Sequence, residues 1–193
     1  MIITFQGENS LKIQTGSQVV LIDPLNQRSF KGANAVLSTI SPSPFSALET
    51  REPFQIEHQG EYEVNGIPIK GWQSAHTNGK EYTIYHMVMD DISIGILGHL
   101  SKEPNPDIQE ALQGVDILVV PGGSEEYLAP HPCAKLIRQI EPGVVIPTLF
   151  DKKTLANFLK EMNQVDRTEE EKLVIKKKEI TPGAMRVVVL AHE

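Results

Sequence analysis

The pattern of this sequence changes near Asn105, and that change limits the folds open to the chain. Before Asn105, runs rich in β-branched and aromatic residues follow one another closely, with Gly, Asn and Ser between them, which is typical of strands joined by short turns. After Asn105, the continuous apolar runs at 115–120 and 143–148 alternate with segments whose apolar residues recur every three or four positions. Strands followed by strand–helix alternation predict two sheets covered by helices.

The same pattern assigns individual elements. Asn65-Gly66 stands between two alternating runs and indicates a hairpin. No linker divides the chain, and 193 residues suit a single domain over 1–193. The charged stretch 167–179 is expected to flank an edge strand. Further strands are expected at 2–6, 11–15, 19–23, 34–39, 54–58, 82–89, 92–97 and 185–191, and helices at 106–112, 132–140 and 152–162.

The composition excludes several functional classes. Lys plus Arg is 18 and Asp plus Glu is 25, which gives a net charge of −7. An acidic surface repels phosphate backbones, so we expect no nucleic-acid partner. The one cysteine, Cys133, allows no internal disulfide, which suits a reducing compartment. The sequence shows neither a basic segment followed by a long apolar run nor an apolar stretch of about 18 residues. We therefore expect no secretory signal, no membrane partner and a cytoplasmic location.

Several phrases of the sequence resemble a known family. They include LIDP at 21–24, GEYEVNG at 60–66 and VDILVVPGG at 115–123. In this order they resemble the metallo-β-lactamase fold, and more narrowly a small bacterial branch of metal-dependent hydrolases related to ascorbate-6-phosphate lactonase. The resemblance covers nearly the whole chain. It implies an α/β protein (α+β in some schemes) built as a four-layer αβ/βα sandwich, with the active site at one edge between the two sheets.

The resembled family carries its metal ligands in a loop with the pattern H-x-H-x-D-H after a Thr, and this sequence departs from that pattern. The Thr is Thr39, and the four ligand positions fall on Ile40, Pro42, Pro44 and Phe45. None of these side chains has a lone pair to offer a metal ion. The prolines also remove two backbone donors. The sequence therefore predicts a degenerate metal loop and a drier, better-filled site.

The other ligand positions of the family are only partly kept. His76 stands at a retained histidine position, and His99 replaces the bridging Asp. Glu8 falls on an early histidine, and the final histidine falls in the stretch that begins at Thr148. Two histidines supply at most half of a tetrahedral site, although a carboxylate such as Glu8 could add a ligand. We expect His76 and His99 to face each other across a narrowed apolar cleft. The pocket candidates are Glu8, Phe45, His76, His99 and Thr148.

Two interpretations remain open for several residues. His76 and His99 either line a pocket with satisfied rings or form part of a metal or substrate site. Ser41 and Ser43 either bond the backbone of their turn or pair with His76 as nucleophile and base. The phrase PGGSEE at 121–126 is either a tight strand-to-loop turn or a phosphate cradle. Asp23 is expected to bond backbone at a strand end, and Cys133 is expected to be a buried small hydrophobe.

The expected function follows from the lost ligands. We expect a binding or assembly protein for an unknown small molecule or protein, which could be a homo-oligomer, with no catalytic residues, no metal and no other cofactor. The alternative is a hydrolase of lactones, esters or phosphodiesters with a rebuilt site that uses His76 and His99, with or without Zn or Mn. A nucleic-acid-processing role is disfavoured by the acidic charge and the missing ligand loop.

Overall fold

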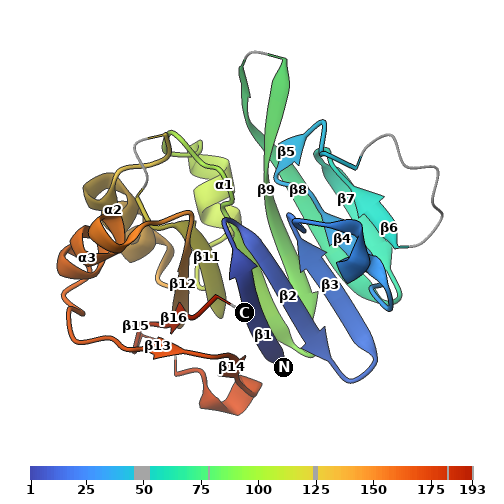
Figure 1. The fold of residues 1–193 in the computed structure, drawn as a ribbon. Helices are drawn as coiled ribbons and strands as arrows, with labels where there is room; N and C mark the ends of the chain where they lie inside the picture. Colours follow the sequence, from blue (N-terminus) through green and yellow to red (C-terminus); the bar gives the residue numbers. More distant parts are fainter. Residues whose placement is uncertain (46–52, 78, 124–125, 182, 193) are drawn as a thin grey trace.

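The computed structural model describes most of the chain, in which a pair of sheets face each other while the helices lie beyond one of them (Figure 1). The described residues contain no helix that is long and apolar enough to cross a membrane. The side chains of His76 and Thr77 lie outside the described region. The described residues are 1–45, 53–77, 79–123, 126–181 and 183–192.

The first sheet is built from the N-terminal region of the chain and one late strand. In the described residues its order is β14-β1-β2-β3-β4-β6. The strands are β1 (Ile2–Gly7), β2 (Ser10–Thr15), β3 (Gln18–Ile22), β4 (Ala35–Leu37), β6 (Phe54–Ile56) and β14 (Leu173–Val174). β1, β2 and β3 pair antiparallel, whereas β3, β4 and β6 pair parallel. The parallel pairing brings the carboxyl ends of β3 and β4 to the same edge of the sheet.

The second sheet has the order β15-β12-β11-β10-β9-β8-β7 in the described residues, with β5 beside β9. β10, β11, β12 and β15 run parallel to one another. A separate pair joins β13 (Glu169–Glu170) to β16 (Val189–Leu190). The strands of the second sheet are β5 (Ile40–Ser41), β7 (Gly60–Val64), β8 (Ile67–Thr77), β9 (Lys80–Met89), β10 (Ile92–Ile96), β11 (Ile117–Pro121), β12 (Val144–Thr148) and β15 (Arg186–Val187).

The helices begin where the sequence supplies caps. Asn105 caps α1 (Pro106–Ala111) by accepting from Ile108 N, and Asp151 forms a capping box with Thr154 at the start of α3 (Lys152–Glu161). α2 (Pro130–Ile140) begins with a proline, whose missing N–H costs a helix nothing at that position. Short 3₁₀ turns, η1 (Gln27–Phe30) and η2 (Lys177–Glu179), lie outside these helices.

Two large apolar clusters hold the layers together. One contains inward-facing residues of both sheets, from Ile3 and Leu11 on the first to Tyr85 and Ile94 on the second. The other lies between the second sheet and the helices, and α2 contributes to it one face of buried residues. That face consists of Cys133, Ala134, Leu136, Ile137 and Ile140.

A third, small cluster covers an area of the outer face of the first sheet. It contains Leu21, Phe30 and Val36, and Phe45 packs against it. The Phe30 and Phe45 rings lie 5.2 Å apart in an edge-to-face arrangement. In the described residues η1 is the helical element of this outer layer, while α1, α2 and α3 contribute to the cluster against the second sheet.

The expected α/β architecture with two sheets is confirmed, as are the three helices, although in the described residues all three helices pack against the second sheet and the first sheet is covered by the 3₁₀ turn η1. The hairpin at Asn65-Gly66 joins β7 to β8, and both residues have the positive φ that its turn requires. The prediction of one strand over 185–191 is wrong, because this run is divided into β15 and β16. β15 pairs with β12, and the chain then leaves that sheet so that β16 can pair with β13.

Candidate functional site

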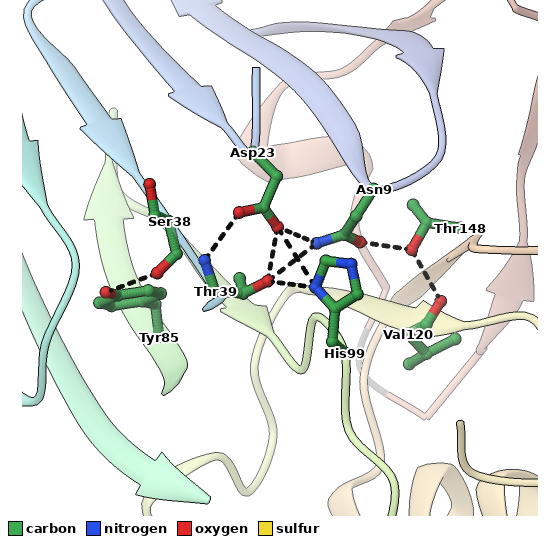
Figure 2. A network of polar contacts seen from close by, with 8 residues as sticks. All are labelled: Asn9, Asp23, Ser38, Thr39, Tyr85, His99, Val120 and Thr148. Atoms are coloured by element: carbon green, nitrogen blue, oxygen red, sulfur yellow. Dashed lines mark hydrogen bonds and ion pairs between the residues drawn. The ribbon is translucent and has the colours of Figure 1, made fainter. Parts of the chain in front are cut away.

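Asp23 lies at the centre of a polar network where β3 and β4 end (Figure 2). Its Oδ1 accepts from the backbone N–H of Thr39 at 2.7 Å. Its Oδ2 accepts from the Thr39 hydroxyl and from the side-chain amide of Asn9, each at 2.5 Å. The expectation that Asp23 bonds backbone at a strand end is therefore confirmed. Both carboxylate oxygens are occupied by donors of the protein itself.

Asn9 extends the network toward the second sheet. It follows Glu8 in the turn between β1 and β2 and is only 1% exposed. Its Oδ1 accepts from the Thr148 hydroxyl at 2.6 Å. Thr148, a pocket candidate, ends β12 and is fully buried. Its hydroxyl fixes the orientation of the Asn9 amide, so that the Asn9 amide N–H faces Asp23.

His99 completes the network, and its hydrogen bonds define its tautomer. The Thr39 hydroxyl carries one proton, which lies on the 2.5 Å bond to Asp23. The 2.7 Å contact between Thr39 Oγ1 and His99 Nδ1 therefore has the imidazole N–H as its donor. Burial lowers the pKa of His99, while the charges of Asp23 and Glu8 partly offset this effect by raising it. In the neutral ring, Nε2 is then an acceptor, and it has no hydrogen-bond partner among the described residues.

A cavity of about 450 Å³ adjoins the network, and His99 and Asp23 belong to its wall. Four apolar residues of the 40–45 segment form another area of that wall. They are Ile40, Pro42, Pro44 and Phe45, the residues at the four ligand positions of the resembled metal loop. The segment that carries metal ligands in the resembled family therefore presents apolar side chains to the cavity.

The described residues do not fit the metal centre that the fold implies. Asp23 has both carboxylate oxygens engaged by Asn9 and Thr39, and His99 has its Nδ1 engaged by Thr39. Among the described residues, no group of three or more His, Cys, Asp and Glu side chains could hold a metal ion. A hydrolytic zinc site needs three protein ligands and an open position, and this donor set does not supply them.

His76 lies in β8, where its backbone is opposite that of Glu81 in β9. Its side chain lies outside the described region of the chain. The expectation that the His76 and His99 rings face each other therefore stays a prediction.

Glu8 lies between two cavities. It has a left-handed backbone with a φ of 52° and is exposed. It lines the 450 Å³ cavity and also a second cavity of about 360 Å³, which Glu126, Tyr127 and Asp151 line as well. The Tyr127 ring meets the His99 ring edge-on at 5.2 Å. Glu8 and Tyr127 thus mark the boundary at which the two cavities approach each other.

Ser43 bonds within its own turn, whereas the pairing of Ser41 with His76 stays a prediction, because the His76 side chain lies outside the described region. Ser43 Oγ donates to Glu57 at 2.8 Å and accepts from Phe45 N at 3.2 Å, which favours the interpretation that it bonds its turn. Ser41 is buried in β5, opposite Glu81 of β9. In the PGGSEE phrase, residues 124–125 lie outside the described region, while the N–H of Gly122 donates to Thr148 O.

Two important residues of the site do not stand out in the sequence. Asn9 holds the network together with Thr39, and Lys80, at the start of β9, lines the cavity. Thr39 is marked by its place before the degenerate loop, although not as a site residue. Nothing in the local pattern marks Asn9 as buried or Lys80 as close to His99.

The comparisons with known proteins agree with the fold described above. A family model described as a β-lactamase superfamily domain matches residues 2–149. A protein of the metallo-β-lactamase superfamily from Thermotoga maritima superimposes with a TM-score of 0.75 at 21% identity, over 98% of this chain and 97% of that one. The metallo-β-lactamase fold protein YhfI from Bacillus subtilis superimposes with a TM-score of 0.69 at 10% identity, over 99% of this chain and 96% of that one.

The metallo hydrolase Igni18 from Ignicoccus hospitalis gives a TM-score of 0.67 at 11% identity, over 98% of this chain and 94% of that one. No match was found among the curated proteins. At these identities the solved structures show the fold, while the family model covers well over half of the chain. The protein therefore belongs to the β-lactamase superfamily and has the metallo-β-lactamase fold.

Proposed function

We propose that this protein binds a small molecule in the 450 Å³ cavity without a metal ion, and that it is not a metal-dependent hydrolase. The observation that carries the proposal is the wall of the cavity. The side chains at the four loop positions are apolar, and the donors Asp23 and His99 are engaged with Asn9 and Thr39.

The chemistry of hydrolysis supports this choice. A catalytic metal ion lowers the pKa of its bound water to about 7 and so supplies hydroxide. Without the ligands, the fold keeps a cavity but loses this source of the nucleophile. A cavity of about 450 Å³ with mostly apolar walls and a few polar groups has the size and lining of a small-molecule site. Solved relatives described as metallo hydrolases, such as Igni18, share the fold, and a fold does not transfer an activity whose site has changed.

Metal analysis tests the proposal directly. We expect purified protein to carry far less than one Zn, Mn or Fe per chain, and chelator to leave the thermal midpoint unchanged. A metal ion at about 1,000 times its dissociation constant stabilises a folded protein by about 4 kcal/mol, so removing a bound metal would lower the midpoint by many degrees. One tightly held equivalent per chain, or a large drop with chelator, would contradict the proposal.

One observation favours a second candidate, a hydrolase with a rebuilt site. The bond to Thr39 leaves Nε2 of the neutral His99 ring as an acceptor without a partner among the described residues, at the wall of the cavity, and such an imidazole can act as a general base. Activity on lactones, esters and phosphodiesters should then be measurable in wild type and lost in His99→Gln. Equal background rates in the two proteins would exclude this candidate.

A further inference from the structure

We propose that the ligand of the 450 Å³ cavity is a small amphipathic anion, in which an apolar ring or chain carries one carboxylate-like group that pairs with Lys80. The inference rests on the proposed function, because it names the class of molecule that the metal-free cavity would take. It follows from the apolar wall, from the charge at Lys80 and from the placement of the acidic residues.

The apolar wall suits an apolar body. Leu25, Ile40, Pro44 and Phe45 all line the cavity. Phe45 is held in place by the Phe30 ring, 5.2 Å away, so this wall is formed before any ligand arrives. Leu25 is 52% exposed although it is a large hydrophobic residue. An apolar group in the cavity would cover some of its surface, which is favourable by the hydrophobic effect.

Lys80 supplies a positive charge that no described side chain neutralises. Among the described residues that line the cavity, it is the one cationic side chain. It is exposed, and it has no hydrogen bond or ion pair with the side chains that the structure describes. Its charge lowers the pKa of His99, so the ammonium lies close enough to His99 to act on it. A lysine ammonium at the side of a cavity is a point charge suited to one anionic group.

The acidic residues decide where the anion can lie. The Asp23 carboxylate is already solvated by donors from Asn9 and Thr39, so it has little need of a cationic ligand. Glu8 repels an anion, but it lies at the boundary with the second cavity, beside Glu126 and Asp151. The anionic group is therefore placed at Lys80, the cationic side chain of the described lining.

A set of probes that share one ring and differ in charge tests the inference. Phenylacetate is the anion, phenylacetamide the neutral analogue and 2-phenylethylamine the cation. Binding is measured by titration calorimetry on the whole chain after chelator treatment, near neutral pH. We expect phenylacetate to bind at least about fivefold more tightly than either analogue, which is the scale of a partly exposed ion pair.

Single substitutions test which residues cause the preference for the anionic probe. Lys80→Gln should reduce the affinity for phenylacetate to that for phenylacetamide, whereas Lys102→Gln, at an exposed lysine that does not line this cavity, should change nothing. Glu8→Gln should tighten phenylacetate binding because it removes a like charge. Leu25→Ser should weaken all three probes, because it removes apolar surface and leaves the charges in place.

Three results would overturn the inference. They are binding of the amide or the amine as tightly as the anion, no binding of any probe, and an affinity for phenylacetate that Lys80→Gln leaves unchanged. None of them bears on the metal content of the same preparation. The metal analysis alone therefore decides whether the proposed metal-free state is wrong, and the probe series decides whether the ligand is an anion.

Discussion

Single residues carry most of the order in this site. Thr39 is the last residue before the degenerate loop, and it meets Asp23 through both its backbone N–H and its hydroxyl. The same hydroxyl accepts from His99, and the Asn9 amide lies 3.4 Å away. Buried polar groups of this kind are costly unless all are paired, so the network should contribute to stability as a unit.

Replacing Asp23 should show this cost. In Asp23→Ala, the buried Thr39 N–H and the Asn9 amide lose their shared acceptor. We expect a loss of roughly 2–4 kcal/mol in the free energy of unfolding, since each unsatisfied buried donor costs about 1–3 kcal/mol. Urea unfolding measures it. Asp166→Ala, at an exposed aspartate, is the matched control and should change stability little. Equal effects of the two variants would show that the network does not stabilise the fold.

The burial of His99 predicts how stability depends on pH. Burial lowers the pKa of His99 despite the charges of Asp23 and Glu8, and Lys80 lowers it further. A histidine in an unfolded chain titrates near pH 6.5. The folded state therefore prefers the neutral ring, and this contribution to stability is complete above pH ~6.5 and lost as the pH falls toward the lower folded pKa.

The comparison of wild type with His99→Gln isolates that contribution. The difference between their free energies of unfolding, wild type minus variant, should rise as the pH is raised from about 5 to about 8. Urea unfolding at several pH values gives this difference, and an NMR titration of the His99 ring gives the pKa directly. A folded pKa above the ordinary value would mean that Asp23 and Glu8 outweigh burial.

At the scale of elements, the loop between β10 and α1 positions His99 by close backbone contact. Gly98 precedes His99 and has a φ of +54°, and a Cβ built on it would lie 2.5 Å from Thr39 Cβ. Only glycine fits such a contact without displacement. The loop therefore brings His99 to Thr39 because a side chain is missing at Gly98.

Gly98→Ala should separate His99 from Thr39. We expect a loss of roughly 2 kcal/mol or more, from overpacking added to backbone strain. Gly114→Ala is the control, since Gly114 has a φ of +69° but no atom within 4 Å of its built Cβ. It should cost only about 1 kcal/mol from strain. If both variants lost the same stability, the contact with Thr39 would have no role.

The elements also show what a sequence can and cannot predict. α2 and the hairpin at Asn65-Gly66 were predictable, because their signals are local and strong. The apolar character of the 40–45 wall followed from the resemblance and the letters themselves. The bond between Asn9 and Thr148 joins residues 139 positions apart, and no periodicity encodes such a pairing. The division of the 185–191 run into two strands was missed, because a continuous apolar run does not reveal that its two halves pair with different strands.

At the scale of the whole molecule, the two sheets are joined by a shared apolar core and by polar contacts across it. Tyr85 is fully buried in β9 of the second sheet. Its hydroxyl lies 3.1 Å from Ser38 O and 3.2 Å from Ile56 O, both on the first sheet (Figure 2 shows the contact with Ser38). Burial raises the pKa of Tyr85 well above its ordinary value, so the hydroxyl stays a donor. Ser38 immediately precedes Thr39, so this contact also supports the site.

Tyr85→Phe should therefore weaken the connection between the sheets. The ring would keep its packing, but the carbonyl groups of Ser38 and Ile56 would lose the single hydroxyl proton that they share in a region with little access to water, which costs roughly 1–3 kcal/mol. The control is Tyr62→Phe, whose hydroxyl donates to His58 O and Gln59 O at an exposed position where water can replace it. We expect urea unfolding to show a clear loss of stability for Tyr85→Phe and a small one for Tyr62→Phe.

Hydrogen exchange adds a test that stability alone does not give, because the Ser38 N–H donates to Ile56 O beside the Tyr85 hydroxyl. Faster exchange there in Tyr85→Phe, with unchanged exchange in α2, would locate the loss at the contact between the sheets. Unchanged stability and exchange would show that the apolar core alone joins them.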